Sequence, residues 1–133
     1  MAKYYLDTCI WIDYFEDRSD RFRPLGYWAF CLTRKIVQDK DAIVFSDVVE
    51  DELLDFYSDE KSRSLLSIVP ENLFVKIKST AKQSEEASVV SRKLNIPFND
   101  ALNAILARDN DAVLVSRDRH FYEFSNVKRP EEL

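Results

Sequence analysis

The stretch KYYLDTCIWIDYFE, residues 3–16, joins a strand-like run directly to a helix-like pattern. Lys3–Leu6 is short, apolar and aromatic, which is typical of a buried strand, and it ends at Asp7. Four apolar side chains beyond it have the i, i+4 spacing of a helix: Ile10, Trp11, Tyr14 and Phe15. The stretch therefore predicts a strand, a carboxylate where the strand ends, and a helix over Cys9–Glu16.

The same alternation continues through the rest of the chain. Further strands are expected at Ala42–Phe45, Leu73–Ile77, Ala112–Val115 and, as a last short piece, near Asn126–Lys128. Helices are expected from just after Pro24 to about Lys40, and at about Asp47–Tyr57, Glu60–Ile68, Ser79–Leu94 and Asn99–Arg108. Strands that alternate with helices predict parallel βαβ units, hence an α/β protein, a three-layer α/β/α sandwich with a parallel sheet. No linker or repeat interrupts the pattern, so residues 1–133 are expected to form a single domain.

Two of the predicted helices begin with capping signals. Asp47 is followed three residues later by Glu50, which resembles a capping box. Asn99 is a favoured capping residue directly before the apolar helix that follows it. We therefore expect Asp47 and Asn99 to cap their helices.

The amino-acid composition excludes several kinds of catalytic site. The 133 residues include one Gly, one His and two Cys. A phosphate-binding loop needs several glycines, and a zinc site needs four Cys or His ligands, whereas Cys9, Cys31 and His120 are scattered along the chain. Any chemistry is therefore expected to depend mainly on carboxylates.

The formal charge of −5 argues against a passive, sequence-independent nucleic-acid coat, which would be basic. It leaves open a nuclease whose acids gather at one metal site. No apolar run approaches the ~20 residues that cross a bilayer, and no signal peptide precedes the first strand. The protein is therefore expected to be cytoplasmic, with no membrane partner.

Two carboxylates follow predicted strands. Asp7 comes directly after the first strand, and Asp118 follows the fourth after two intervening residues. Each could be an ordinary helix cap or turn residue, which Asp fills well. Because ligands of parallel sheets collect at the carboxyl ends of the strands, the pair also predicts a site, provided that the two strands are neighbours.

Glu52 lies on the apolar face of its predicted helix. The stripe consists of Val48, Val49, Leu53 and Phe56, and Glu52 is four residues from both ends of it. A carboxylate that faces a core costs several kcal/mol unless a metal ion or a lysine compensates its charge. A side chain at the edge of the stripe that turns outward to solvent is the alternative.

Asp100, Asn103 and His120 are the remaining candidates. Asp100 lies in the first turn of an apolar helix, where an acid interacts favourably with the helix dipole. Because Asn99 is expected to cap this helix, Asp100 is not needed as a cap. Asn103 shares its face and could orient it. His120 could touch a substrate, although a lone His is more often a surface or packing residue.

Four blocks of the sequence resemble PIN-domain proteins: LDTCIWI at 6–12, SDVVEDEL at 46–53, IPFNDALNAILA at 96–107 and VSRDRHF at 115–121. They occur in the order of that family, at fitting intervals, and span almost the whole chain. Residues 1–133 thus resemble a single PIN-like nuclease domain, most similar to small prokaryotic PIN proteins of the VapC toxin type. The resemblance implies a parallel sheet with strand order 3-2-1-4-5.

Carried over position by position, the resemblance implies an acidic metal site for Mg²⁺ or Mn²⁺ formed by Asp7, Glu52, Asp100 and Asp118. Thr8 and Ser116 match the hydroxyl residues beside the first and last acids, and Asn103 is expected to support the site. Some family members carry a further acid just after the last one, and His120 stands near that place. Three residues are candidate RNA contacts: Arg117, Arg119 and His120.

The function expected from the resemblance is a metal-dependent endoribonuclease, the toxin of a toxin–antitoxin pair. It implies RNA as substrate, a small antitoxin protein as partner, and a homodimer for which aromatic side chains of the early helices would supply a surface. The alternative is a PIN-fold binding or assembly module with weak or no nuclease activity. A haloacid-dehalogenase-type phosphatase is disfavoured, because it needs a second Asp where Cys9 stands.

Overall fold

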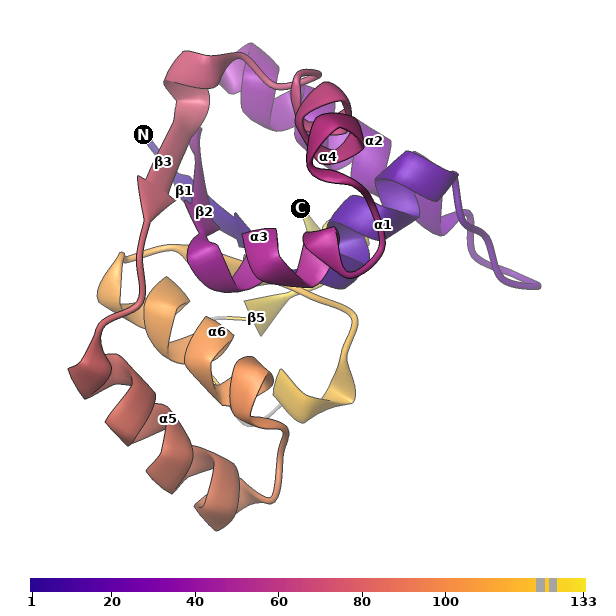
Figure 1. Cartoon of the computed structure of the whole chain (residues 1–133). Coiled ribbons are helices and arrows are strands. Elements are labelled where there is room, and N and C mark those ends of the chain that lie inside the picture. Colours follow the sequence, from indigo (N-terminus) through magenta and orange to yellow (C-terminus); the bar gives the residue numbers. More distant parts are fainter. Residues whose placement is uncertain (122–123, 125–126) are drawn as a thin grey trace.

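Five parallel strands form one sheet in the computed structural model, which describes residues 1–121, 124 and 127–133 (Figure 1). The order is β3-β2-β1-β4-β5, and each neighbouring pair is parallel. The strands are β1 Lys3–Leu6, β2 Ala42–Ser46, β3 Phe74–Ile77, β4 Val113–Val115 and β5 Val127–Lys128. The expected parallel sheet and its order are therefore confirmed. The last strand was predicted to begin near Asn126, which lies outside the described residues.

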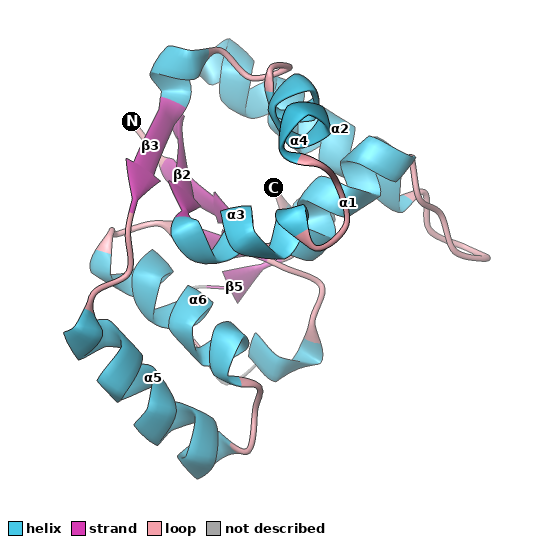
Figure 2. Cartoon of the chain, viewed as in Figure 1, coloured by secondary structure: helices cyan, strands magenta, loops and turns pink. Residues whose placement is uncertain are grey.

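In the part of the chain that the structure describes, six α-helices surround the sheet: α1 Thr8–Glu16, α2 Leu25–Asp39, α3 Asp47–Leu54, α4 Asp59–Leu66, α5 Ala81–Leu94 and α6 Phe98–Asp109. Short 3-10 turns lie at Glu71–Leu73 (η1), Arg119–Phe121 (η2) and Pro130–Glu132 (η3). Helices α5 and α6 pack together on one side of the sheet, and α1 and α2 pack together on the other (Figures 1 and 2). Helix α3 lies between the two pairs and contacts both α1 and α6.

The central strands are buried on both faces, as expected for a parallel sheet covered by helices. Tyr5 of β1 pairs in register with Val44 of β2 on one side and Leu114 of β4 on the other, and all three are almost fully buried. Directly after β1, the backbone N–H of Asp7 donates to the carbonyl of Val115 at 3.0 Å. The pairing of β1 with β4 therefore fixes Asp7 at the carboxyl edge of the sheet.

The start of α3 differs from the predicted capping box. Ser46, not Asp47, caps the helix, and its Oγ accepts a hydrogen bond from the backbone N–H of Val49 at 3.2 Å. The Asp47 carboxylate instead accepts from the backbone N–H and the hydroxyl of Ser79, each at 2.9 Å. The helix also ends at Leu54, so Phe56 is exposed and does not continue the predicted apolar stripe.

The start of α6 also differs from the prediction. The helix begins at Phe98 and Pro97 precedes it as the boundary residue, with φ −57° and ψ 145°. Asn99 is therefore inside the first turn and does not cap the helix. Pro97 ends the helix on this side, because it has no N–H to donate to an upstream carbonyl and its ring would clash with a preceding helical turn. Asp100 remains in the first turn, as expected.

Gly26 allows α1 and α2 to approach closely. Its backbone N–H donates to the carbonyl of Arg18 at 2.7 Å. A Cβ atom at this position would lie 2.6 Å from the Cα of Asp17 and 2.8 Å from the carbonyl oxygen of Asp13. Both of these contacts are with backbone atoms, so the contact between the two helices requires glycine here.

None of the helices in the described part of the chain combines the length and the apolar character that crossing a bilayer requires.

Gly26→Ala should destabilise the protein by about 1–3 kcal/mol, because the added methyl group overlaps backbone that cannot move aside. The intrinsic helix preference of Ala over Gly, about 1 kcal/mol, would act in the opposite direction. Urea unfolding measures the difference. Gln38→Ala, at an exposed site of the same helix, should change the stability by less than about 0.5 kcal/mol. Equal midpoints for the two variants would contradict the close contact.

Candidate metal centre

Asp7 is held at the end of β1 by three neutral donors. It caps α1, and its Oδ1 accepts from the backbone N–H of Thr8 at 2.8 Å. Its Oδ2 accepts from the hydroxyl of Ser116 at 2.9 Å and from the Cys9 thiol at 3.5 Å. Burial raises the pKa of Cys9, which keeps this thiol a neutral donor. The sequence allowed Asp7 to be either a helix cap or part of a site beside the fourth strand. In the structure, Asp7 caps α1 and also lies beside that strand.

The charge of Asp7 has no cationic partner among the described residues. The side chain is buried, with 6% of the residue exposed. Burial raises the pKa of Asp7, the hydrogen bonds from Ser116 and Thr8 oppose this, and repulsion from Asp100 adds to it. A buried carboxylate that is solvated only by neutral donors is suited to binding a cation.

Glu52 faces inward toward Asp7. Its Oε1 accepts from the hydroxyl of Thr8 at 3.1 Å and from the side-chain amide of Asn103 at 3.4 Å. Burial raises the pKa of Glu52, and the charge of Asp7 raises it further. Glu52 is partly buried at its position on α3. Thr8 therefore links the first and second predicted acids.

The orientation of the Asn103 amide is set by Tyr5. The Tyr5 hydroxyl donates to Oδ1 of Asn103 at 2.5 Å and lies 2.6 Å from Oγ of Ser46. With Oδ1 occupied by this donor, the NH₂ group of Asn103 points to Glu52. Tyr5, Ser46 and Asn103 are all nearly fully buried. The predicted supporting residue thus acts on Glu52, and no hydrogen bond is described between it and Asp100.

Asp100, Asp118 and His120 form the outer part of the site. Nδ1 of His120 lies 2.6 Å from Oδ2 of Asp100 and 3.1 Å from Oδ1 of Asp118. The backbone N–H of His120 also donates to Oδ1 of Asp118 at 3.0 Å, and the N–H of Asp118 donates to Ser116 at 3.0 Å. One donor atom from each of the three residues lies within 4.8 Å of the others.

Mutual repulsion connects the inner and outer acids. Burial raises the pKa of Asp100, and the charges of Asp118 and Glu52 raise it further. The hydrogen bond with Asp100 raises the pKa of His120. The compact donor group among the described residues thus contains Asp100 and Asp118 but not Asp7 or Glu52. Asp7 and Glu52 are linked to each other through Thr8, and Asp7 is linked to Asp118 through Ser116. Oxygen donors of this kind fit Mg²⁺ or Mn²⁺.

Arg117 and Arg119, two of the candidate RNA contacts, lie in different surroundings. The Arg117 guanidinium donates to the buried Asp13 carboxylate through Nε at 2.7 Å and Nη2 at 2.8 Å. Arg119 is exposed. The Asp13–Arg117 pair was not predicted from the sequence. An acid between Ile12 and Tyr14, inside the apolar run from Ile10 to Phe15, was the available signal for it.

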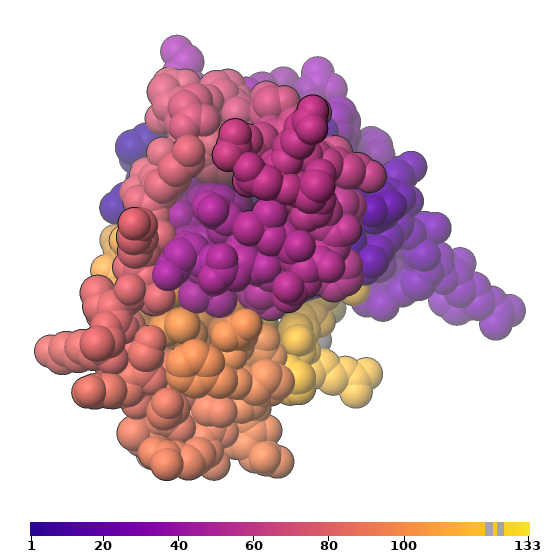
Figure 3. Space-filling view, viewed as in Figure 1, coloured from indigo at the N-terminus to yellow at the C-terminus, as the bar shows by residue number. Residues whose placement is uncertain are grey.

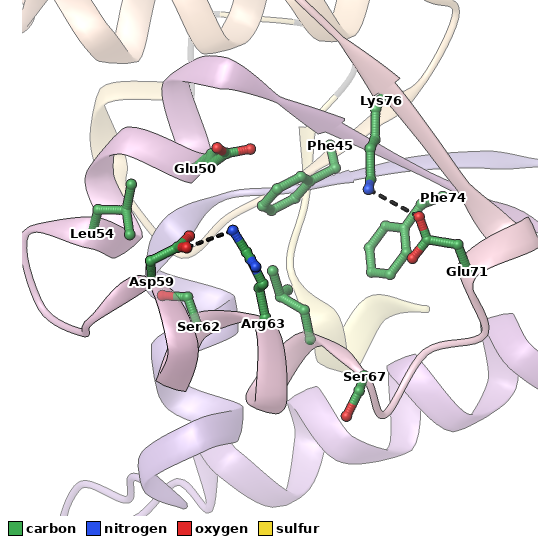
Figure 4. A pocket seen from close by; sticks show the side chains of 11 residues that line it. Phe45, Glu50, Leu54, Asp59, Ser62, Arg63, Ser67, Glu71, Phe74 and Lys76 are labelled. Atoms are coloured by element: carbon green, nitrogen blue, oxygen red, sulfur yellow. Dashed lines mark hydrogen bonds and ion pairs between the residues drawn. The ribbon is translucent and has the colours of Figure 1, made fainter.

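A separate hollow of about 420 Å³ lies between α3, α4, η1 and β3. Phe45 and Phe74 line it, together with the Asp59–Arg63 and Glu71–Lys76 ion pairs (Figure 4). None of the predicted site residues lines this hollow. In the space-filling view, α3 covers the centre of this face and α6 lies below it (Figure 3). The candidate metal centre and the hollow are therefore distinct features.

Several solved structures share this fold, and one of them is a toxin–antitoxin complex. A toxin–antitoxin complex from Klebsiella pneumoniae matches with TM-score 0.66 and 19% identity, covering 96% of this chain and 97% of that one. VapBC2 from Rickettsia felis, bound to a DNA fragment from their promoter, matches with TM-score 0.68 and 20% identity, covering 96% and 98%. FitAcB from Neisseria gonorrhoeae gives 0.61 and 16%, covering 97% and 99%. At these identities the likeness shows the fold.

A comparison with curated protein sequences finds no match. A comparison with protein families does, and the match extends from residue 4 in β1 to residue 127 in β5. It includes all or part of each of the five strands and each of the four carboxylates described above. The chain belongs to the PIN domain family.

Proposed function

We propose that the protein is a Mg²⁺- or Mn²⁺-dependent endoribonuclease. The observation that carries the proposal is the buried Asp7 carboxylate, which has neutral donors only and lies among three further acids. Proteins of the PIN family are typically nucleases, which supports the same reaction. Asp7 and Asp100 would be the primary ligands of the ion, and Glu52 and Asp118 would be ligands or water-orienting groups.

When bound, the ion would supply a Lewis acid and would neutralise charge that develops on the scissile phosphate. The protein contributes the orientation of the carboxylates. Ser116 and the N–H of Thr8 hold the two oxygens of Asp7 in place. A carboxylate that is already oriented loses little entropy when it acts, and this is how preorganised sites accelerate reactions.

Glu52 is suited to orient and deprotonate a water molecule. Both of its described hydrogen bonds, from Thr8 and Asn103, go to Oε1. This arrangement holds the side chain through one oxygen, and no hydrogen bond to Oε2 is described. A carboxyl group whose pKa is raised toward neutrality is a better base than an ordinary one. RNA phosphates would lie over the exposed Arg119 and His120, whereas the guanidinium of Arg117 already binds Asp13.

A small antitoxin protein is the proposed partner. The similar solved structures include a toxin–antitoxin complex, which supports this assignment. An Arg or Lys of the partner would compensate the acids and exclude the metal. The proposal also includes a homodimer, for which Tyr27 and Phe30 of α2 present exposed aromatic surface.

A binding or assembly module without catalysis is the second candidate, and metal binding separates the two. Such a module would not need a cation at Asp7. The nuclease requires that Mg²⁺ or Mn²⁺ stabilise the folded protein through the carboxylates.

Asp7→Asn should reduce metal-dependent RNA cleavage by roughly 100-fold or more, because the variant lacks a primary ligand. A labelled RNA incubated with purified protein, with and without Mg²⁺ or Mn²⁺, measures the loss. Asp51→Asn, which removes an exposed acid of α3, should cleave at the wild-type rate. An active Asp7→Asn variant would contradict the assignment.

The same Asp7→Asn variant should be more stable than wild type without metal, by about 1 kcal/mol or roughly 3–5 °C in Tm. The substitution removes a buried charge, and an Asn side chain can still cap α1. With added Mn²⁺ the order should reverse, because only wild type gains binding energy. Thermal unfolding in chelator and in Mn²⁺ provides both comparisons, and a metal response of equal size in the two proteins would argue for the binding-module alternative.

Metal-free protein should lose stability as the pH rises above the ordinary carboxyl range near 4. Asp7, Glu52 and Asp100 have raised pKa values, so above that range the folded state binds more protons than the unfolded state. Their ionisation therefore destabilises the fold above the ordinary carboxyl range near pH 4. Urea unfolding across this range tests the sign. The slope should be shallower in Asp7→Asn, and a rise in wild-type stability with pH would be inconsistent with raised carboxyl pKa values.

A further inference from the structure

His120 presents a nitrogen donor to the carboxylates of the site. Its Nδ1 is 2.6 Å from Oδ2 of Asp100 and 3.1 Å from Oδ1 of Asp118. The acids come from different elements, since Asp100 is in the first turn of α6 and Asp118 follows β4. Three donor atoms of two chemical kinds thus converge on one small volume.

The ring position is fixed by the backbone around it. The N–H of His120 donates to Oδ1 of Asp118 at 3.0 Å, which closes a tight turn. The next residue, Phe121, is completely buried and anchors η2 beneath the site. Although the imidazole is about half exposed, its Nδ1 faces the acids and not solvent.

These spacings fit the edges of a six-coordinate ion. Metal–ligand distances near 2.1 Å in an octahedron place neighbouring donors about 3 Å apart. The distances from Nδ1 to the two oxygens lie on either side of this value. An ion could therefore replace the proton between Nδ1 and Asp100 with a small adjustment of the side chains, and that proton would leave to solvent.

Resting on the proposed metal-dependent function, we propose that Nδ1 of His120 is a direct ligand of the ion, beside Asp100 and Asp118. The site then has mixed nitrogen and oxygen donors. Imidazole suits transition-metal ions, whereas Mg²⁺ prefers oxygen donors and retained water. His120 is thus the residue that makes the site select Mn²⁺ over Mg²⁺.

The single histidine of the chain makes this ligand directly observable. In tag-free protein loaded with Mn²⁺, electron spin-echo envelope modulation detects nitrogen bound to the ion, and an imidazole signal can come only from His120. We expect that signal in wild type and its loss in His120→Asn. Arg119→Ala, which changes the exposed neighbouring residue of η2, should retain it.

Affinities measured by calorimetry test the selectivity. His120→Asp converts the donor set to oxygen only, so the ratio of Mn²⁺ to Mg²⁺ affinity should fall by about tenfold or more. Circular dichroism and unfolding midpoints check that each variant folds. The exposed position of His120 favours folding of both variants.

Two kinds of negative result can be distinguished. Bound Mn²⁺ without an imidazole signal, or an unchanged affinity ratio in His120→Asp, would overturn the role of His120 and leave the nuclease proposal standing. Failure of Mn²⁺ to bind, or binding that Asp7→Asn does not weaken, would overturn the proposed function and the role of His120 with it.

Discussion

The burial of an uncompensated carboxylate at Asp7 is the constraint on which the site depends. The side chain reaches its position because β1 pairs with β4, and the Asp7 N–H continues that pairing to Val115. Burying a carboxylate costs several kcal/mol unless its oxygens are satisfied. Ser116, Thr8 and Cys9 satisfy them without cancelling the charge. The protein thus retains an electrostatic cost at one edge of its sheet, and a bound cation would relieve it.

The surrounding hydrogen bonds orient the other acids without adding positive charge to the inner part of the site. A chain of neutral groups runs from Ser46 on β2 through Tyr5 on β1 to Asn103 on α6, and ends at Glu52 on α3. These contacts tie two strands and α6 to one carboxylate. A lysine beside Glu52 would compete with the ion for its charge. Neutral donors achieve orientation while the negative potential remains.

The features that depend on local patterns could be predicted from the sequence, and those that depend on distant partners could not. Apolar runs that end at Asp7 and before Asp118 indicated the strands, and the stripe around Glu52 indicated its inward side. The predicted cap of α3 was wrong because Ser46 and Asp47 are both good caps. Which of them caps the helix depends on Ser79, which binds Asp47 from 32 residues away. Asp13 and Arg117 are 104 residues apart, so their pairing has no local signal. His120 joined the acids through a turn that spacing alone does not reveal.

The Asp13–Arg117 pair has a mechanical consequence for the loop after β4. Arg117 lies between Ser116 and Asp118, and its two-pronged contact with a buried carboxylate resists both sliding and rotation. The loop cannot leave α1 without exposing an unpaired charge from the protein interior. Loop and helix are therefore coupled at this point. A displacement of Asp118 away from α1 would strain or break the Asp13–Arg117 pair, so the pair restrains an acid of the site that it does not touch.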